Sequence, residues 1–193
     1  MNTGKSTALL QVAHNYERNG EKVVLVKPGA DTKAGNQVQS RLGIEREVDV
    51  LATPDDDVRK AVHAVYREQL IRCVLVDEAQ FLQPKQVDQL LELAVYDGIT
   101  VIAYGLRTDF RRQLFPGSQR FFELAHNIEE LKTQCRCMVN GKAVFNARFV
   151  DGDMVFDGDQ VAIDGEKNIT YEPLCARCYL DAEQAVVQEE MKD

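Results

Sequence analysis

The chain opens with Met1-Asn2-Thr3-Gly4-Lys5-Ser6, whose last three residues match the end of a phosphate-binding loop, G-x-x-x-x-G-K-[ST]. The first glycine of the full pattern would lie two positions before Met1. In such loops, successive backbone N–H groups and the amino end of the following helix surround one anion. Lys5 would then reach the outer phosphates of a nucleotide, and the Ser6 hydroxyl would bind Mg²⁺. A G-K-S triplet also begins many ordinary helices, so this motif alone leaves both interpretations open.

The composition favours one substantial domain, with or without a small additional module. The chain has 193 residues, of which 45% are hydrophobic, and its formal net charge is −8. An acidic chain has no electrostatic attraction to nucleic acid or to anionic lipid. No apolar run approaches the roughly 20 residues that span a bilayer, and the first residues do not resemble a secretory signal. We therefore expect a cytoplasmic protein without nucleic-acid or membrane partners.

Helical patterns alternate with short apolar runs over residues 1 to about 126, which predicts an α/β domain with a parallel sheet covered by helices. The predicted strands are 22–26, 73–76 and 99–104. The predicted helices run from Gly4 to about Arg18, from about Asp57 to Arg72 with Val58, Val62, Val65, Tyr66 and Leu70 on one face, and from Pro84 to Gly98. An aperiodic loop is expected over 31–48, and a terminal helix after about Ala182.

A phosphate-binding loop normally follows a central strand of such a sheet. Here that strand would have to precede Met1, where the given sequence begins. A missing central strand would leave two rows of backbone hydrogen-bonding groups unpaired in the core. We therefore expect that the start codon has been assigned too late. A fragment, or a sheet that has lost one strand, are the alternatives.

A second nucleotide signal comes directly after the apolar run Val74-Leu75-Val76, where Asp77 and Glu78 follow. In phosphate-loop enzymes, an Asp at the end of this strand holds Mg²⁺, directly or through water. Glu78, one residue further on, could take the proton from a hydroxyl that attacks the γ-phosphate. The alternative interpretation is a polar strand end that caps a turn.

The cysteines form two close pairs, Cys135-x-Cys137 and Cys175-x-x-Cys178. This spacing suits tetrahedral Zn²⁺, and four thiolates would leave no open position, so the metal would be structural. The alternative is a set of reduced free thiols. Cys73, the fifth cysteine, lies in a predicted buried strand and is expected in the core.

These residues together resemble the thymidine kinases of the zinc-containing, phosphate-loop class. Four separated motifs carry the resemblance in the family's order, and Asp31-Thr32 is similar to a D-T-R segment of the family, with Lys33 in place of the Arg. The four motifs are Asp77-Glu78-Ala79-Gln80-Phe81, Tyr104-Gly105-Leu106, Asp109-Phe110-Arg111 and Tyr171 before Cys175-x-x-Cys178-Tyr179.

The resemblance implies transfer of the γ-phosphate of ATP to the 5′-hydroxyl of thymidine, with Mg²⁺ and a structural Zn²⁺, in a homo-oligomer that is usually a tetramer. It implies a phosphate-loop domain over 1–128 and a zinc-bearing lasso domain over 129–193. Glu78 would be the base, and Arg111 a clamp on the transferred group. The ATP phosphates would contact Asn2, Thr3, Gly4, Lys5, Ser6 and Thr7, and Mg²⁺ would be held by Ser6, Asp77 and Asp31. Thymidine would contact Met1, Leu106, Phe110, Phe115, Asn146, Val161, Ile163, Ile169 and Tyr171, and Zn²⁺ would bind Cys135, Cys137, Cys175 and Cys178.

Three other functions remain open at this point. A phosphate-loop ATPase that acts on a partner protein would need no nucleoside pocket. A catalytically impaired kinase, or a non-catalytic protein stapled by zinc, would follow if the incomplete loop does not hold ATP.

Overall fold

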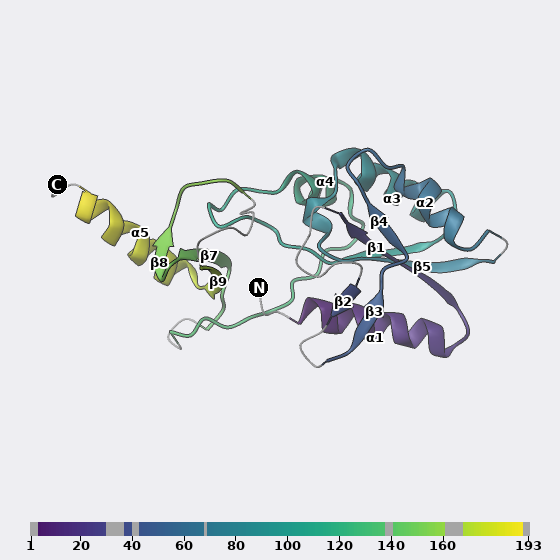
Figure 1. The fold of residues 1–193 in the computed structure, drawn as a ribbon, viewed down its shortest axis with the longest axis horizontal. Helices are drawn as coiled ribbons and strands as arrows, with labels where there is room; N and C mark the ends of the chain where they lie inside the picture. Colours follow the sequence, from purple (N-terminus) through teal and green to yellow (C-terminus); the bar gives the residue numbers. More distant parts are fainter. Residues whose placement is uncertain are drawn as a thin grey trace. The chain divides into compact units, whose positions relative to one another are not determined.

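The computed structural model describes residues 4–29, 37–39, 43–67, 69–137, 141–160 and 168–190 (Figure 1). The contacts between residues group the described chain into two compact units. The larger unit contains Gly4–Arg107 and Phe115–Glu129, and the smaller contains Thr108–Leu114 together with the residues from Glu130 onward. A loop from the middle of the chain thus packs with the carboxyl-terminal residues. The division between residues 128 and 129 stays a prediction.

The larger unit contains a parallel sheet with the strand order β4-β1-β5-β6. Its strands are β1 (Lys22–Pro28), β4 (Val50–Ala52), β5 (Ile71–Val76) and β6 (Thr100–Ala103). Strands β1 and β5 lie at the centre of the described sheet and are buried over almost their whole length, as expected where helices cover both faces. The predicted α/β class is confirmed.

The two faces of the sheet pack against different helices, because neighbouring residues of a strand point to opposite sides. On one face, Val23 and Leu25 pack against Leu9 of helix α1 (Lys5–Arg18). On the other face, Val24 packs in a cluster with Val62. The helices of that second layer are α2 (Val58–Val65), α3 (Pro84–Val95) and α4 (Pro116–Leu124) (Figure 1).

Helix α2 is shorter than the sequence predicts. It ends at Val65, and Leu70, which was expected on its apolar face, has 68% of its surface exposed. The strand that follows begins at Ile71 rather than at Cys73, because Ile71 pairs with Lys22 of β1. The prediction of a helix up to Arg72 was therefore wrong: pairing with the sheet takes precedence over a helical pattern at its end.

The stretch 31–48 is not entirely a loop. It contains a short antiparallel pair, β2 (Gln37–Gln39) and β3 (Glu45–Glu47), in which Val38 is buried against α1. Strands of three residues that are mostly polar carry too little periodicity to be recognised in the sequence. Strand β4 and helix α4 were not predicted either.

The smaller unit contains an antiparallel sheet with the order β8-β7-β9, formed by β7 (Phe145–Val150), β8 (Asp153–Val155) and β9 (Ile169–Leu174). Asp151 and Gly152 both have positive φ, as a type I′ hairpin turn between β7 and β8 requires. Helix α5 (Ala176–Glu190) begins directly after Cys175, earlier than the predicted start near Ala182. Among the helices of the described residues, none is long and apolar enough to cross a membrane.

Candidate functional site

The amino end of α1 has the geometry of an anion site. Gly4, the residue before the helix, has φ 75°, a left-handed conformation that glycine adopts without strain. It offers no side-chain cap, and no acidic residue occupies the first turn. The first N–H groups of a helix have no partner within the helix, so those of Lys5, Ser6 and Thr7 are suited to bind an anion.

Asp77 follows the carboxyl end of β5 with only 5% of its surface exposed. Its Oδ1 atom is buried without a hydrogen-bond partner in the described part of the chain. Burial, with a further contribution from the charge of Glu78, raises the pKa of Asp77 to about 6, although Lys5 and Lys27 act in the opposite direction. A buried carboxylate oxygen without a partner is the kind of ligand that Mg²⁺ prefers, so Asp77 fits the predicted metal.

Glu78 stands between a cation and an amide. Its Oε1 atom lies 3.9 Å from Nζ of Lys5, and its Oε2 atom accepts a hydrogen bond from Nε2 of Gln80 at 2.6 Å. Its backbone has φ 46°, a conformation that non-glycine residues adopt at a cost and often at functional sites. The structure therefore brings together two residues that are 73 positions apart in the sequence and were predicted to share one site.

Gln80 was not predicted from the sequence as a functional residue. Its buried side chain also accepts a hydrogen bond from the backbone N–H of Leu106 at 3.0 Å, so it links Glu78 to a predicted thymidine contact. The carbonyl of Leu106 in turn accepts from the Ser118 hydroxyl at 2.6 Å. Phe115, another predicted thymidine contact, is buried in the larger unit, and its ring packs edge-to-face against Phe81.

The other described residues that were predicted to contact thymidine belong to the smaller unit. Phe110 is buried, and the guanidinium of Arg148 lies 3.7 Å from the centroid of its ring. Nδ2 of Asn146 donates to the carbonyl of Thr108 at 3.5 Å. Tyr171 and Ile169 lie in β9, and the Tyr171 hydroxyl accepts a hydrogen bond from Nε of Arg148 at 2.9 Å.

Arg111, which was predicted to clamp the transferred phosphate, is engaged with its neighbour Asp109. Its Nη2 lies 3.3 Å from Oδ2 of Asp109, and its backbone N–H donates to Oδ1 of the same residue at 2.9 Å. Asp109 is buried, so this pair fixes the loop that carries Phe110.

The four paired cysteines converge on one point. Their Sγ atoms all lie within 4.8 Å of one another, and those of Cys137 and Cys175 are 3.7 Å apart. A tetrahedron with Zn–S bonds of about 2.3 Å has edges of about 3.8 Å, so the set fits a closed zinc site. Hydrogen bonds with the thiols of Cys175 and Cys137 raise the pKa of Cys178 to about 12. A cation at the centre would reverse that effect by stabilising thiolates.

A family model described as thymidine kinase matches residues 1–179. The chain belongs to the thymidine kinase family. It is 44% identical over 184 residues to a protein of Idiomarina loihiensis named thymidine kinase, and this match covers 94% of the chain and 93% of that protein. A thymidine kinase of Enterobacteria phage T4 is 41% identical over 179 residues, covering 92% and 90% of the two chains. One of Lactococcus lactis is 40% identical over 184 residues, covering 95% and 94%. The predicted membership is confirmed.

Some residues that the family resemblance singles out are not part of the described structure. Met1, Asn2, Thr3, Asp31, Val161 and Ile163 lie outside the described residues. Their predicted contacts with ATP, Mg²⁺ and thymidine remain predictions.

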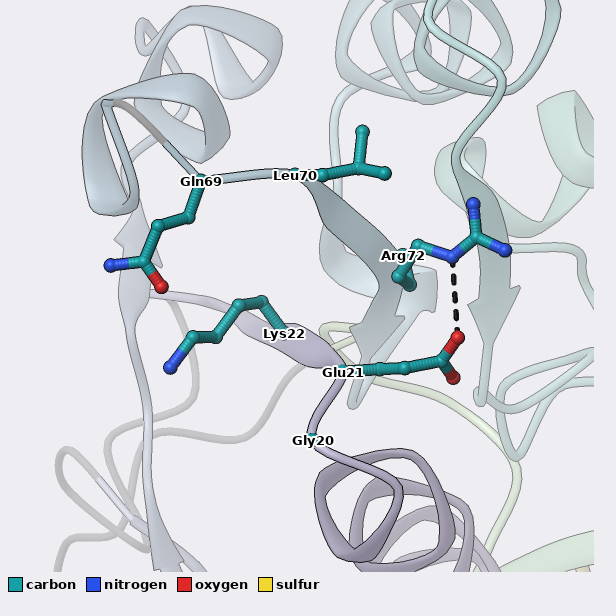
Figure 2. A pocket seen from close by; sticks show the side chains of 6 residues that line it. All are labelled: Gly20, Glu21, Lys22, Gln69, Leu70 and Arg72. Carbon is teal, nitrogen blue, oxygen red and sulfur yellow. Dashed lines mark hydrogen bonds and ion pairs between the residues drawn. The ribbon is translucent and has the colours of Figure 1, made fainter.

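Figure 2 shows a surface pocket of the larger unit. It has a volume of about 360 Å³ and is lined by Gly20, Glu21, Lys22, Gln69, Leu70 and Arg72. Arg72 is held there by Glu21, with 3.3 Å between Nε and Oε1. The pocket is found at the amino ends of β1 and β5, whereas Asp77 follows the carboxyl end of β5. Because the strands are parallel, these are opposite edges of the sheet, and this pocket is separate from the predicted nucleotide site.

Replacing Asp77 with Asn is expected to raise the melting temperature of the protein in the absence of nucleotide and Mg²⁺. The carboxyl has a pKa of 3.8 when exposed and about 6 when folded, so the folded chain holds the proton more tightly. Ionisation therefore lowers the free energy of unfolding as the pH rises from about 4 to 6, and the loss persists above pH 6. We expect the Asn variant to have a free energy of unfolding about 1–3 kcal/mol higher than the wild type at pH 7.5, and the same as the wild type below about pH 4.

Thermal melts at these two pH values measure the effect. The exposed Asp55→Asn substitution in the same unit is the matched control, with no change expected at either pH. A lower melting temperature of Asp77→Asn at pH 7.5 would contradict the unfavourable charge.

Proposed function

We propose that this protein transfers the γ-phosphate of ATP to the 5′-hydroxyl of thymidine. The observation that carries the proposal is the meeting of Lys5 and Glu78, 3.9 Å apart, beside the orphaned buried oxygen of Asp77. Enzymes that transfer phosphoryl groups rely on positioning and charge neutralisation more than on covalent chemistry. A lysine, a metal-binding carboxylate and a second carboxylate on the acceptor side supply these elements.

The phosphate-binding residues act through the positive charge of Lys5 and through the orientation of their backbone N–H groups. The backbone N–H groups from Gly4 to Thr7 point at the phosphates, and the ammonium group of Lys5 reaches their outer oxygens. The Ser6 hydroxyl and the Asp77 carboxylate would hold Mg²⁺, which when bound neutralises the charge that develops during transfer. The two anionic partners of Lys5, Glu78 in the free protein and phosphate in the complex, compete for the same cation.

Glu78 acts as the general base in this proposal. Gln80 holds Oε2, so the carboxylate has a fixed orientation. When the ammonium group of Lys5 turns to the phosphates, Oε1 becomes available to accept the proton of the 5′-hydroxyl. A base held in this way removes the proton as the oxygen attacks the γ-phosphate.

The nucleoside pocket and the zinc site complete the proposal. Apolar and aromatic walls with a few polar groups suit a flat pyrimidine. The family resemblance assigns this role to Leu106 and Phe115 of the larger unit, and to Phe110, Asn146, Ile169 and Tyr171 of the smaller unit. Cys135, Cys137, Cys175 and Cys178 would bind a structural Zn²⁺, a role supported by the distances between their sulfur atoms. A homo-oligomeric state and a cytoplasmic location remain predictions.

The release of ADP in response to thymidine tests this function. We expect ADP formation in the presence of ATP and Mg²⁺ to rise with the thymidine concentration and to saturate, with thymidine monophosphate formed in equal amount. 5′-Deoxythymidine, which lacks only the acceptor hydroxyl, is the matched control and should give no such rise. An ATPase acting on a protein partner would release ADP at the same rate with and without thymidine, and a binding protein would release none.

A further inference from the structure

Arg148 is a buried cation in the middle of the smaller unit. Only 4% of its surface is exposed, and its partners in the described part of the chain include neutral groups and aromatic rings. Nε donates to the Tyr171 hydroxyl at 2.9 Å, and Nη2 donates to the carbonyl of Gln160 at 3.1 Å. The guanidinium carbon lies 3.7 Å from the ring centroid of Phe110, close enough for a stacked cation–π contact. Burial of a charge is costly, so this arrangement calls for a reason.

The register of the sheet explains how Arg148 reaches these partners. It lies on β7, the central strand, directly opposite Tyr171 of β9, and opposed side chains of an antiparallel pair point to the same face. Asn146, two residues earlier on β7, shares that face because side chains alternate along a strand. Asn146 contacts the backbone of Thr108 and Arg148 contacts the ring of Phe110, so both hold the same loop.

The loop that carries Phe110 is fixed from several directions. Oδ1 of Asp109 accepts hydrogen bonds from the backbone N–H groups of Arg111 and Gln113, at 2.9 and 2.8 Å. Its Oδ2 atom accepts from Nε2 of Gln160 at 3.2 Å, and the carbonyl of Gln160 is the acceptor of Arg148. The loop backbone is thus held by Asp109, and the Phe110 ring by Arg148.

We propose that Arg148 is the positioning residue of the thymidine pocket. It fixes the Phe110 ring and the Tyr171 hydroxyl before the nucleoside arrives, so the walls of the pocket are ordered in the free protein. This inference rests on the proposed function, in which Phe110 and Tyr171 contact thymidine. Prior ordering reduces the cost of binding, so Arg148 acts on the affinity for thymidine and not on the phosphoryl transfer step.

The test compares the kinetic constants of Arg148→Met, Arg148→Lys and Tyr171→Phe with those of the wild type. We expect Arg148→Met to raise the KM for thymidine at least about fivefold, the change that follows loss of a hydrogen bond to a charged group. The kcat value and the KM for ATP should stay within about twofold. Arg148→Lys keeps the charge but lacks the planar fork, so it should recover only part of the affinity. Adding Tyr171→Phe to Arg148→Met should raise the KM for thymidine by a smaller factor than Tyr171→Phe does in the wild type. The hydrogen bond between the two side chains is already absent in the Arg148→Met protein.

A matched control is Arg136→Met, which removes an exposed arginine of the same unit that pairs with Glu172; its KM for thymidine should not change. An unchanged KM in a folded Arg148→Met variant, or an equal rise in the KM for ATP, overturns the inference. If Arg148→Met does not fold, the other two single variants decide: a raised KM in both supports the role, and an unchanged KM in both rejects it. A wild-type protein that does not respond to thymidine would reject the proposed function itself, which keeps the two failures distinct.

Discussion

Replacing Glu78 with Gln is expected to lower kcat at least about 100-fold while the affinity for thymidine stays near that of the wild type. The amide has the shape of the carboxylate, and its carbonyl oxygen can still accept the hydrogen bond from Gln80. What it cannot do is accept the proton of the 5′-hydroxyl at neutral pH. Loss of rate without loss of binding is therefore the expected behaviour of a missing base.

Steady-state rates and calorimetric titration with thymidine measure the two quantities separately. Glu47→Gln, a substitution of an exposed carboxylate on β3, is the matched control and should leave both unchanged. Turnover of Glu78→Gln near that of the wild type would remove the residue from its assigned role. A large loss of thymidine affinity in a folded variant would move Glu78 from the chemistry to substrate binding.

The second large effect is expected when both Cys175 and Cys178 are replaced with Ser. Zinc binding by four thiolates contributes directly to folding, with apparent free energies of about 10–16 kcal/mol in small zinc modules. The sulfur atoms hold together Cys137 from one segment and the start of helix α5 from another. We expect the double variant to lose its bound zinc and the smaller unit to lose its sheet, with a marked fall in the melting temperature.

Metal analysis, circular dichroism and limited proteolysis follow these changes. Cys73→Ala is the matched control, because it removes a cysteine from the core of the larger unit without touching the cluster. This variant should keep the full zinc content, although removal of the buried sulfur leaves a small cavity in the core. A double variant that keeps its sheet and its melting temperature would show that the four cysteines are ordinary reduced thiols.

The sequence allowed the central fold to be predicted where the local pattern and the tertiary environment agree. Helix α1 and strand β1 were predicted because a helical face ends at Asn19-Gly20 and an apolar run follows. Prediction failed at the end of α2, where Ile71 pairs with Lys22 across the sheet. Prediction also failed for β2 and β3. Strands of three residues depend on pairing with each other and, for β2, on the packing of Val38 against α1.

In the candidate site too, residues in short sequence motifs were predicted, and residues whose contacts are distant in the sequence were not. Lys5, Asp77, Glu78 and the cysteine pairs belong to motifs that can be recognised within a few residues. Gln80 and Arg148 were not predicted to have a role, because the contacts that suggest one include residues far along the chain. Gln80 contacts Leu106, and Arg148 contacts Phe110, 26 and 38 positions away in the sequence. Only the folded chain shows that these buried polar side chains hold the residues around them.

Tyr179, the residue after Cys178, connects the cysteine cluster to the loop that carries Phe110. Its ring is buried, and its hydroxyl donates a hydrogen bond to the backbone carbonyl of Phe110. The first turn of α5 thus connects Cys178, a predicted zinc ligand, to the loop that carries Phe110. Because Tyr179 connects the proposed Zn²⁺ site to this loop, we expect zinc depletion to weaken the binding of thymidine more than the binding of ATP.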